Sequence, residues 1–199
     1  MKAYRYFLLL FFAVAFGSAH AAQTNTPFSL LKQVGDKLFV DIAAVDAQGD
    51  DKKAKLKEVV KTRLIPHIDT KFVSFKLLGK HVREINKGQA LAFIDAVESY
   101  LTVTYADALM SYKGQEVRFI KPNGHGDNGY ASVKTEIVEP GKPTIDIVFK
   151  LRRDKSGTWR VYDLVAEGIS LLNAKQKEII ARISEVGIDQ VNQELSAKS

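Results

Sequence analysis

The fold of this chain is decided by the stretch Thr158-Trp159-Arg160-Val161-Tyr162-Asp163-Leu164-Val165-Ala166-Glu167-Gly168-Ile169-Ser170. β-Branched and aromatic residues dominate it between a turn at 154–157 and a break at Gly168, which predicts a strand over 158–168. Because side chains alternate along a strand, one face should carry Trp159, Val161, Asp163 and Val165, and the other Arg160, Tyr162, Leu164 and Ala166. Both faces are largely apolar, which is typical of an interior strand.

Three further strands are predicted before this one, over 115–121, 130–139 and 144–153. Short turns join them, so consecutive strands should pair as antiparallel hairpins. A helix over 174–186 should follow the last strand, with Asn173 as its N-cap and Gln176 three residues later. A short helix begun by Asp189 should close the chain.

The first half of the sequence has the period of helices. Helices are predicted over 28–42, over 53–64 with Asp50 or Asp51 as cap, over 72–81 begun by Asp69 or Thr70, and over 87–112. The last is apolar over so much of its circumference that it must be covered on several sides. Helices followed by a meander predict a single α+β domain, a sheet with one face wrapped by helices.

The N-terminal segment has the pattern of a removable secretory signal. Lys2 and Arg5 precede an apolar run over 7–16, and Ala19 and Ala21 hold the cleavage-site positions. The run is too short to span a bilayer. We therefore expect residues 1–21 to be a signal peptide and residues 22–199 to form the exported domain.

Composition excludes several classes of protein. The chain has no cysteine, so an exported domain must rely on its core rather than on disulfides. Its net charge of +6 favours anionic surfaces, either lipid headgroups or an acidic protein. No basic block with interleaved aromatic residues indicates a nucleic-acid partner. His67, His81 and His125 show no spacing of metal ligands, so no metal site is expected.

Five segments carry a family resemblance. They stand in order as Leu64-Ile65-Pro66-His67-Ile68-Asp69, Leu77-Leu78-Gly79-Lys80-His81, Tyr100-Leu101-Thr102-Val103-Thr104-Tyr105-Ala106-Asp107-Ala108-Leu109, Tyr112-Lys113-Gly114-Gln115 and Asp163-Leu164-Val165-Ala166-Glu167-Gly168-Ile169-Ser170-Leu171. Together they closely resemble the MlaC family, the periplasmic phospholipid-binding component of the system that maintains outer-membrane lipid asymmetry, also called the toluene-tolerance family. The resemblance covers nearly all of residues 27–195. One departure is Val82, where an aromatic residue is expected.

The resemblance implies a fold, a function and partners. The fold is a curved antiparallel sheet of about four strands with helices around it, related to the NTF2-like shape and enclosing a deep apolar cavity. The function is that of a soluble periplasmic shuttle, not an enzyme, with phospholipid as cargo and no cofactor. The partners are an outer-membrane lipoprotein–porin complex and an inner-membrane ABC transporter with an MCE-domain subunit. We expect the protein to be a monomer.

A lipid carrier must offer the acyl chains nearly the cover that a bilayer gives. Two chains with roughly thirty methylenes carry on the order of 24 kcal/mol of transfer free energy. Only a wide apolar cavity provides that cover; an ordinary dry core built from the same residues is the alternative. The expected lipid contacts are Leu77, Phe93, Val97, Leu101, Tyr105, Ile147, Phe149, Trp159, Val161 and Val165.

Two other functions remain open from the sequence. NTF2-like folds also host enzymes, and Asp163 is the candidate general base, with Tyr105 and His67 as possible partners. The structural interpretation, which we favour, is that Asp163 caps a backbone group or pairs with an arginine. The third class is a lipid-free periplasmic adaptor that binds only other proteins.

A basic cluster at the end of one hairpin is the candidate docking surface. It comprises Lys150, Arg152, Arg153 and Arg160, with Asp154 as the one local acid, and Ile169 could supply an apolar centre. Charged patches of this kind act mainly on association rates. A simple solvated hairpin end is the alternative.

Overall fold

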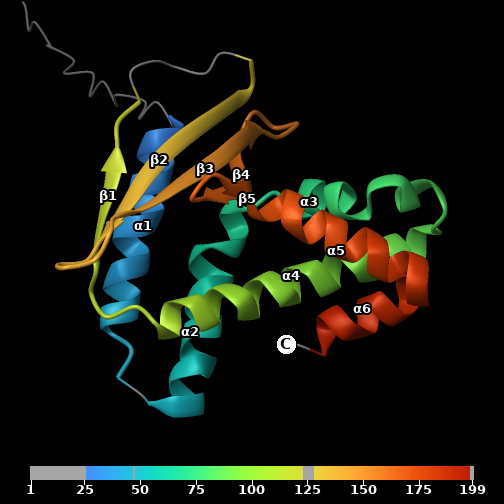
Figure 1. Ribbon diagram of the computed structural model, residues 1–199, viewed down its shortest axis with the longest axis horizontal. Coiled ribbons are helices and arrows are strands. Elements are labelled where there is room, and N and C mark those ends of the chain that lie inside the picture. The colour runs from blue at the N-terminus through green and yellow to red at the C-terminus, as the bar shows by residue number, and fades with distance from the viewer. Residues whose placement is uncertain (1–25, 47, 123–127, 198–199) are drawn as a thin grey trace, which may run out of the picture.

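The structure is a computed structural model that describes residues 26–46, 48–122 and 128–197. Helices occupy the first half of the chain, and a sheet followed by two helices occupies the second (Figure 1). The predicted signal segment 1–21 and His125 lie outside the described residues. The elements in chain order are α1 (Pro27–Ala43), α2 (Gly49–Arg63), η1 (Ile65–His67), α3 (Thr70–Leu78), η2 (Gly79–Arg83), α4 (Lys87–Met110), β1 (Glu116–Ile120), β2 (Tyr130–Val138), β3 (Ile145–Arg153), β4 (Trp159–Ala166), β5 (Ile169–Ser170), α5 (Leu171–Val186) and α6 (Ile188–Ser196).

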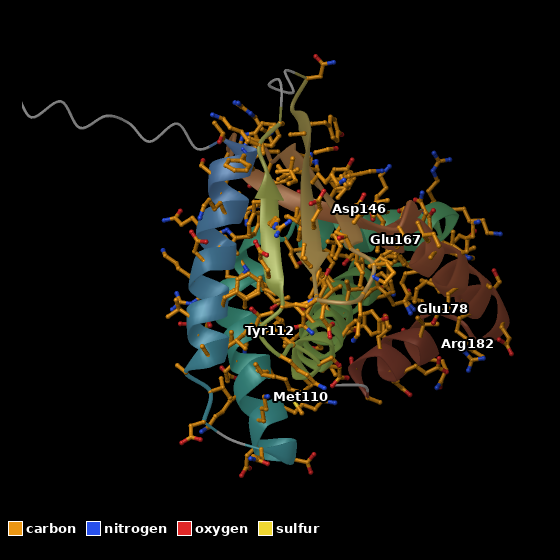
Figure 2. All side chains as sticks on the ribbon, turned by 60° about the vertical axis from the view of Figure 1, so that its left-hand side comes forward. Met110, Tyr112, Asp146, Glu167, Glu178 and Arg182 are labelled. Atoms are coloured by element: carbon orange, nitrogen blue, oxygen red, sulfur yellow. The ribbon has the colours of Figure 1, made fainter. Side chains whose placement is uncertain are left out.

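The predicted α+β meander is confirmed, with five strands rather than about four. The sheet has the order β1-β2-β3-β4-β5, and all neighbours are antiparallel. The stretch predicted as one strand breaks after Ala166, where Glu167 and Gly168 both have positive φ angles, 48° and 80°. The Glu167 N–H donates to the Asp146 carbonyl at 3.1 Å, and its carboxylate accepts from the Asp146 N–H at 2.7 Å (Figure 2). These two hydrogen bonds attach the turn at Glu167 and Gly168 to β3, and the chain then runs back along β4 as β5.

A β-bulge in β4 changes which side chains share a face. The register pairs Leu151 with Val161 but Lys150 with Asp163, so Tyr162 is an extra residue opposite β3. Because Lys150 and Leu151 point to opposite faces of the sheet, Val161 and Asp163 do so too. The prediction that Trp159, Val161, Asp163 and Val165 share one face of the sheet is therefore wrong for the residues after Val161.

One face of the sheet packs against α1. Leu31 of α1 forms a buried cluster with Val133, Leu151, Trp159 and Val161. The opposite face of β2 and β3 carries charged side chains, including the ion pair of Lys134 with Asp146 at 2.9 Å. The sheet is thus apolar on its helix side and polar on much of the other, which agrees with the predicted layout.

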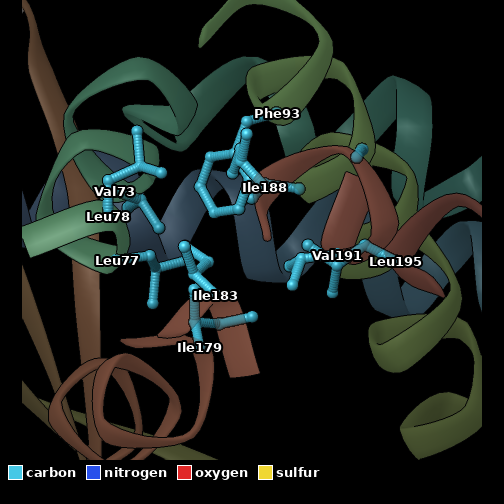
Figure 3. Close-up of a cluster of buried hydrophobic side chains, with 11 residues drawn as sticks. Val73, Leu77, Leu78, Phe93, Ile179, Ile183, Ile188, Val191 and Leu195 are labelled. Carbon is cyan, nitrogen blue, oxygen red and sulfur yellow. The ribbon is translucent and has the colours of Figure 1, made fainter. Parts of the chain in front are cut away.

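The helices form two further hydrophobic cores beside the sheet. α1, α2 and α4 enclose one around Leu56, Val60 and Ala106. α3, α4, α5 and α6 enclose the other, in which Phe93 of α4 is fully buried (Figure 3). Val97 of the same helix is also fully buried there. α4 contributes to both cores, which explains why it is apolar over so much of its circumference. The prediction that this helix is covered on several sides is confirmed.

Two helix starts differ from the sequence prediction. α5 begins three residues earlier than expected, because the Ser170 hydroxyl is the cap and accepts a hydrogen bond from the Asn173 N–H at 3.1 Å. Asn173 is therefore not the N-cap. α2 starts after Gln48 without a side-chain cap, so neither Asp50 nor Asp51 is the cap. Both lie in the first turn, where their negative charges interact favourably with the positive end of the helix dipole.

Candidate functional site: an apolar cavity between α3, α4, α5 and β4

A cavity of about 360 Å³ lies where α3, α4 and α5 meet β4. Its volume is near the lower end of the range for small-molecule sites, about 300–1,000 Å³. Most of its lining side chains are aliphatic or aromatic. They are Ile68, Val73, Leu77, Tyr100, Leu101, Thr104, Tyr105, Val161, Tyr162, Asp163, Leu164, Leu171, Leu172, Ala174, Lys175 and Glu178.

Local sequence explains how each element reaches the cavity. Tyr100, Leu101, Thr104 and Tyr105 are two adjacent pairs one turn apart on α4, so they form a single patch of that helix. Four consecutive residues of β4, 161–164, contribute instead of alternate ones, and the bulge at Tyr162 lies among them. The exposed lining residues lie on α4 and on the first two turns of α5, which places the mouth of the cavity between these two helices.

Asp163 is the one acid in the interior of the cavity wall, and its oxygens are occupied. Its side chain is 4% exposed. It accepts hydrogen bonds from the Ser170 hydroxyl at 2.8 Å and from the Leu172 N–H at 3.1 Å, and Lys150 Nζ lies 3.7 Å away. The interpretation that Asp163 caps a backbone group is confirmed; its basic neighbour is a lysine rather than an arginine.

Tyr105 stays neutral in this environment. Burial, and after it the negative charge of Asp163, raise the pKa of the Tyr105 phenol above its ordinary value. A phenol that resists ionisation cannot easily serve as a base. His67, the third member of the predicted catalytic group, belongs to η1 and does not line the cavity.

Another histidine forms a serine–histidine–glutamate arrangement outside the cavity. His81 Nδ1 lies 2.5 Å from Glu84 Oε2, and its Nε2 lies 3.3 Å from Ser184 Oγ. The Ser184 hydroxyl also donates to the Ile180 carbonyl at 3.0 Å within α5. These contacts connect η2 to α5. Over the residues that the structure describes, no group of three or more potential ligands could hold a metal ion.

Comparisons with known proteins identify the family. The family model described as MlaC protein matches residues 32–197, which is most of the chain. The chain belongs to the MlaC family. The intermembrane phospholipid transport system binding protein MlaC of Haemophilus influenzae is 30% identical over 185 residues, 92% of this chain and 86% of that protein.

A solved structure has the same fold. The phospholipid-binding protein of Ralstonia solanacearum, in complex with a phospholipid, matches with a TM-score of 0.73 and 20% sequence identity. The match covers 87% of this chain and 96% of that one. In the part of this MlaC family member that the structure describes, no helix is long and apolar enough to cross a membrane.

Four of the ten predicted lipid contacts line the cavity: Leu77, Leu101, Tyr105 and Val161. They come from α3, α4 and β4, so three elements distant in sequence converge as expected. Sequence reasoning missed several neighbours in the wall. Val73 precedes Leu77 by one turn of α3, and this spacing was the signal that could have found it. Tyr100 and Leu172 had no comparable signal.

The other six predicted contacts lie elsewhere in the MlaC fold. Phe93 and Val97 belong to the helical core shared by α3, α4, α5 and α6, and both are fully buried. Phe149 and Trp159 pack with α1 on the sheet. The last two, Ile147 and Val165, are half-buried on β3 and β4 and do not line the cavity.

The basic cluster predicted for docking is more neutralised than expected. Arg152 pairs with Asp69, which also caps α3, and its guanidinium lies 4.4 Å from the ring centre of Phe72. Lys150 lies near Asp163. The expectation that Asp154 is the only local acid is therefore wrong, because the fold brings two distant carboxylates to the cluster.

The remaining members of the cluster differ in exposure and contacts. Arg160 Nε lies 2.7 Å from Asp154, and its guanidinium also donates to the Pro66 carbonyl. Arg153 lies over the ring of Trp159, 4.8 Å from its centre. Ile169 is 63% exposed on β5, next to the N-terminus of α5 and thus near the cavity mouth. Arg153 and Ile169 are the members best placed to meet a partner.

Proposed function

We propose that this MlaC family member is a periplasmic phospholipid carrier that moves lipid between two membranes. The observation that carries the proposal is the apolar cavity between α3, α4, α5 and β4, in which the one buried acid, Asp163, is occupied by structural hydrogen bonds. The names of the two relatives, one a binding protein of intermembrane phospholipid transport and one a phospholipid-binding protein, support it. Residues 1–21 act as the export signal, and residues 22–199 form the carrier domain.

The cavity volume sets how much of a lipid it covers. A methylene group is similar in size to a water molecule, which occupies about 30 Å³, so 360 Å³ holds on the order of a dozen methylenes. Their burial contributes about 10 kcal/mol. A lipid with two chains needs more than twice this cover. Both chains of a lipid therefore need more space than the cavity offers in this structure.

The carrier meets a different partner at each membrane. Its partners are an MCE-domain subunit of an inner-membrane ABC transporter and an outer-membrane lipoprotein–porin complex. Ile169 lies on the surface that meets them and is close enough to the cavity mouth for docking and lipid release to be coupled. Arg153 lies at the opposite end of the β3–β4 hairpin, where it pairs with Trp159, and makes a separate contact. The protein acts as a monomer and needs no cofactor.

The direct test is to extract the purified protein with organic solvent and to measure phospholipid per protein chain by mass spectrometry. We expect stoichiometric glycerophospholipid in the wild type. Leu101→Trp, which places a large ring in the cavity, should lose most of the load. The matched control is Leu91→Trp, on the same helix but 52% exposed and outside the cavity, which should keep it.

Two outcomes would contradict the proposal. A well-folded wild-type protein without lipid, even after incubation with vesicles, would favour the adaptor. A full load in Leu101→Trp would show that lipid does not occupy this cavity.

A further inference from the structure

The mouth of the cavity carries one pair of opposite charges. Among the lining residues of the described chain, Lys175 is the only cation, and Glu178 lies one turn further along α5. Lys175 Nζ lies 2.7 Å from Glu178 Oε2 and 4.7 Å from the ring centre of Tyr100, which also lines the cavity. The pair therefore lies at the rim of the cavity, with Lys175 against the ring of Tyr100.

The Lys175 ammonium and the Glu178 carboxylate can both contact a charged ligand at the cavity mouth. Burial lowers the pKa of Lys175, but the contacts with Glu178 and Tyr100 outweigh it, and the pKa is raised above its ordinary value. The ammonium thus stays charged although its side chain is only 24% exposed. The Glu178 side chain is 60% exposed, so its carboxylate can turn from Lys175 toward another cation at the mouth.

We infer that Lys175 and Glu178 recognise a zwitterionic phospholipid headgroup, with Lys175 on the phosphate and Glu178 on an ammonium. This inference rests on the proposed lipid-carrier function. With the acyl chains in the cavity, the phosphate of the lipid comes to the mouth, where Lys175 is held. In an ethanolamine headgroup the ammonium follows the phosphate after two methylenes. This span is similar to the separation of about 5–6 Å between Cβ atoms three residues apart on a helix.

The same arrangement disfavours a headgroup that carries only negative charge. Such a headgroup gains the attraction of Lys175 but meets the carboxylate of Glu178 one turn away, and it offers that carboxylate no cation. Contacts between exposed charges are worth about 0.2–1 kcal/mol each. The preference should therefore be modest, roughly two- to fivefold, while the acyl chains provide most of the binding.

The test is competitive loading from vesicles that contain equal amounts of phosphatidylethanolamine and phosphatidylglycerol. The bound lipids are extracted and their ratio is measured by mass spectrometry. We expect the wild type to be enriched in phosphatidylethanolamine, roughly two- to fivefold. Glu178→Gln should reverse the enrichment, because Lys175 then favours the anionic lipid. Lys175→Gln should lower the bound phosphatidylglycerol further, since only the carboxylate remains.

Matched controls separate this local effect from net charge. Lys177→Gln and Glu185→Gln make the same charge changes on α5 outside the cavity, and their lipid ratios should equal that of the wild type. If the wild type binds lipid without headgroup preference, or if the variants and controls give one common ratio, the inference is wrong while the carrier function stands. If the wild type binds no lipid, the proposed function itself fails.

Discussion

The carboxylate of Asp163 accepts a hydrogen bond from the backbone N–H of Leu172, 3.1 Å away, across the corner where the sheet ends and α5 begins. The same carboxylate accepts from the Ser170 hydroxyl, which in turn caps α5. One buried side chain on β4 thus holds the N-terminus of the helix that forms a wall of the cavity.

Replacing Asp163 should therefore damage stability. Asp163→Ala leaves the Leu172 N–H and the Ser170 hydroxyl without their acceptor in a buried site, and we expect the free energy of unfolding to fall by about 1–3 kcal/mol. Asp163→Asn keeps an oxygen acceptor and should cost less. Urea unfolding measures both. An alanine variant as stable as the wild type would show that this carboxylate is not structural.

Two tryptophan substitutions one turn apart on α4 should behave differently. Val97 is fully buried in the helical core, so Val97→Trp overpacks it and should destabilise the fold by about 1–3 kcal/mol or more. Leu101 lines the cavity, so Leu101→Trp has space and should mainly expel lipid. Thermal unfolding, read beside the lipid content of each variant, distinguishes these outcomes. Equal losses of stability would mean that the cavity is not available to the new ring.

The two neighbouring arginines of β3 should also differ. Arg152→Glu places a carboxylate beside the Asp69 carboxylate, whose side chain is 13% exposed, and should cost about 2–4 kcal/mol. Arg153→Glu loses the contact with the Trp159 ring, worth about 0.5–1 kcal/mol. Chemical denaturation of both variants tests this order, and the reverse order would contradict it.

If Arg153 and Ile169 contact a partner, their replacement should slow lipid delivery, and only the effect of Arg153 should depend on salt. Arg153→Glu should slow lipid delivery to partner-containing vesicles at low salt, and the difference should shrink as salt screens the charge. Ile169→Glu should slow delivery at all salt concentrations without loss of bound lipid. Val40→Glu, at a residue of α1 that is 68% exposed, is the control and should deliver normally. Normal delivery by both docking variants would place the interface elsewhere.

His67 should make stability depend on pH. Burial, and after it the charges of Arg160 and Lys37, lower the pKa of His67 below its ordinary value of about 6.5. As pH falls below about 6.5, the unfolded chain binds a proton that the folded His67 resists, so folding stability decreases toward acid pH. His67→Gln should make the slope of unfolding free energy between about pH 6.5 and 5 shallower. An unchanged slope would exclude His67 as its source.

Much of the fold could be predicted because its signals are local. Asp69 was expected to begin α3, and its carboxylate accepts from the Phe72 N–H at 3.1 Å. The change of period near Gln115 located the passage from helix to sheet. The start of α5 could not be predicted as easily, since Ser170 and Asn173 are both good caps and only the position of β5 chooses between them.

The cavity wall was harder to predict because it depends on contacts between distant elements. Val97 and Leu101 have the same chemistry and lie one turn apart, yet only Leu101 lines the cavity. The bulge at Tyr162 depends on the register with β3, which no local pattern in β4 reveals. For the same reason, the pairing of Arg152 with a carboxylate from another element was invisible in the sequence.

The shortness of β5 also limits how easily this edge of the sheet can pair with another chain. Exposed sheet edges can pair with strands from other chains and so promote aggregation. Here one edge ends after two residues and turns at once into α5, while a parallel bridge between Ile68 and Val161 occupies more of β4. The opposite edge, β1, is five residues long and carries the charged pair Glu116 and Arg118. The meander is thereby protected at both ends against aggregation.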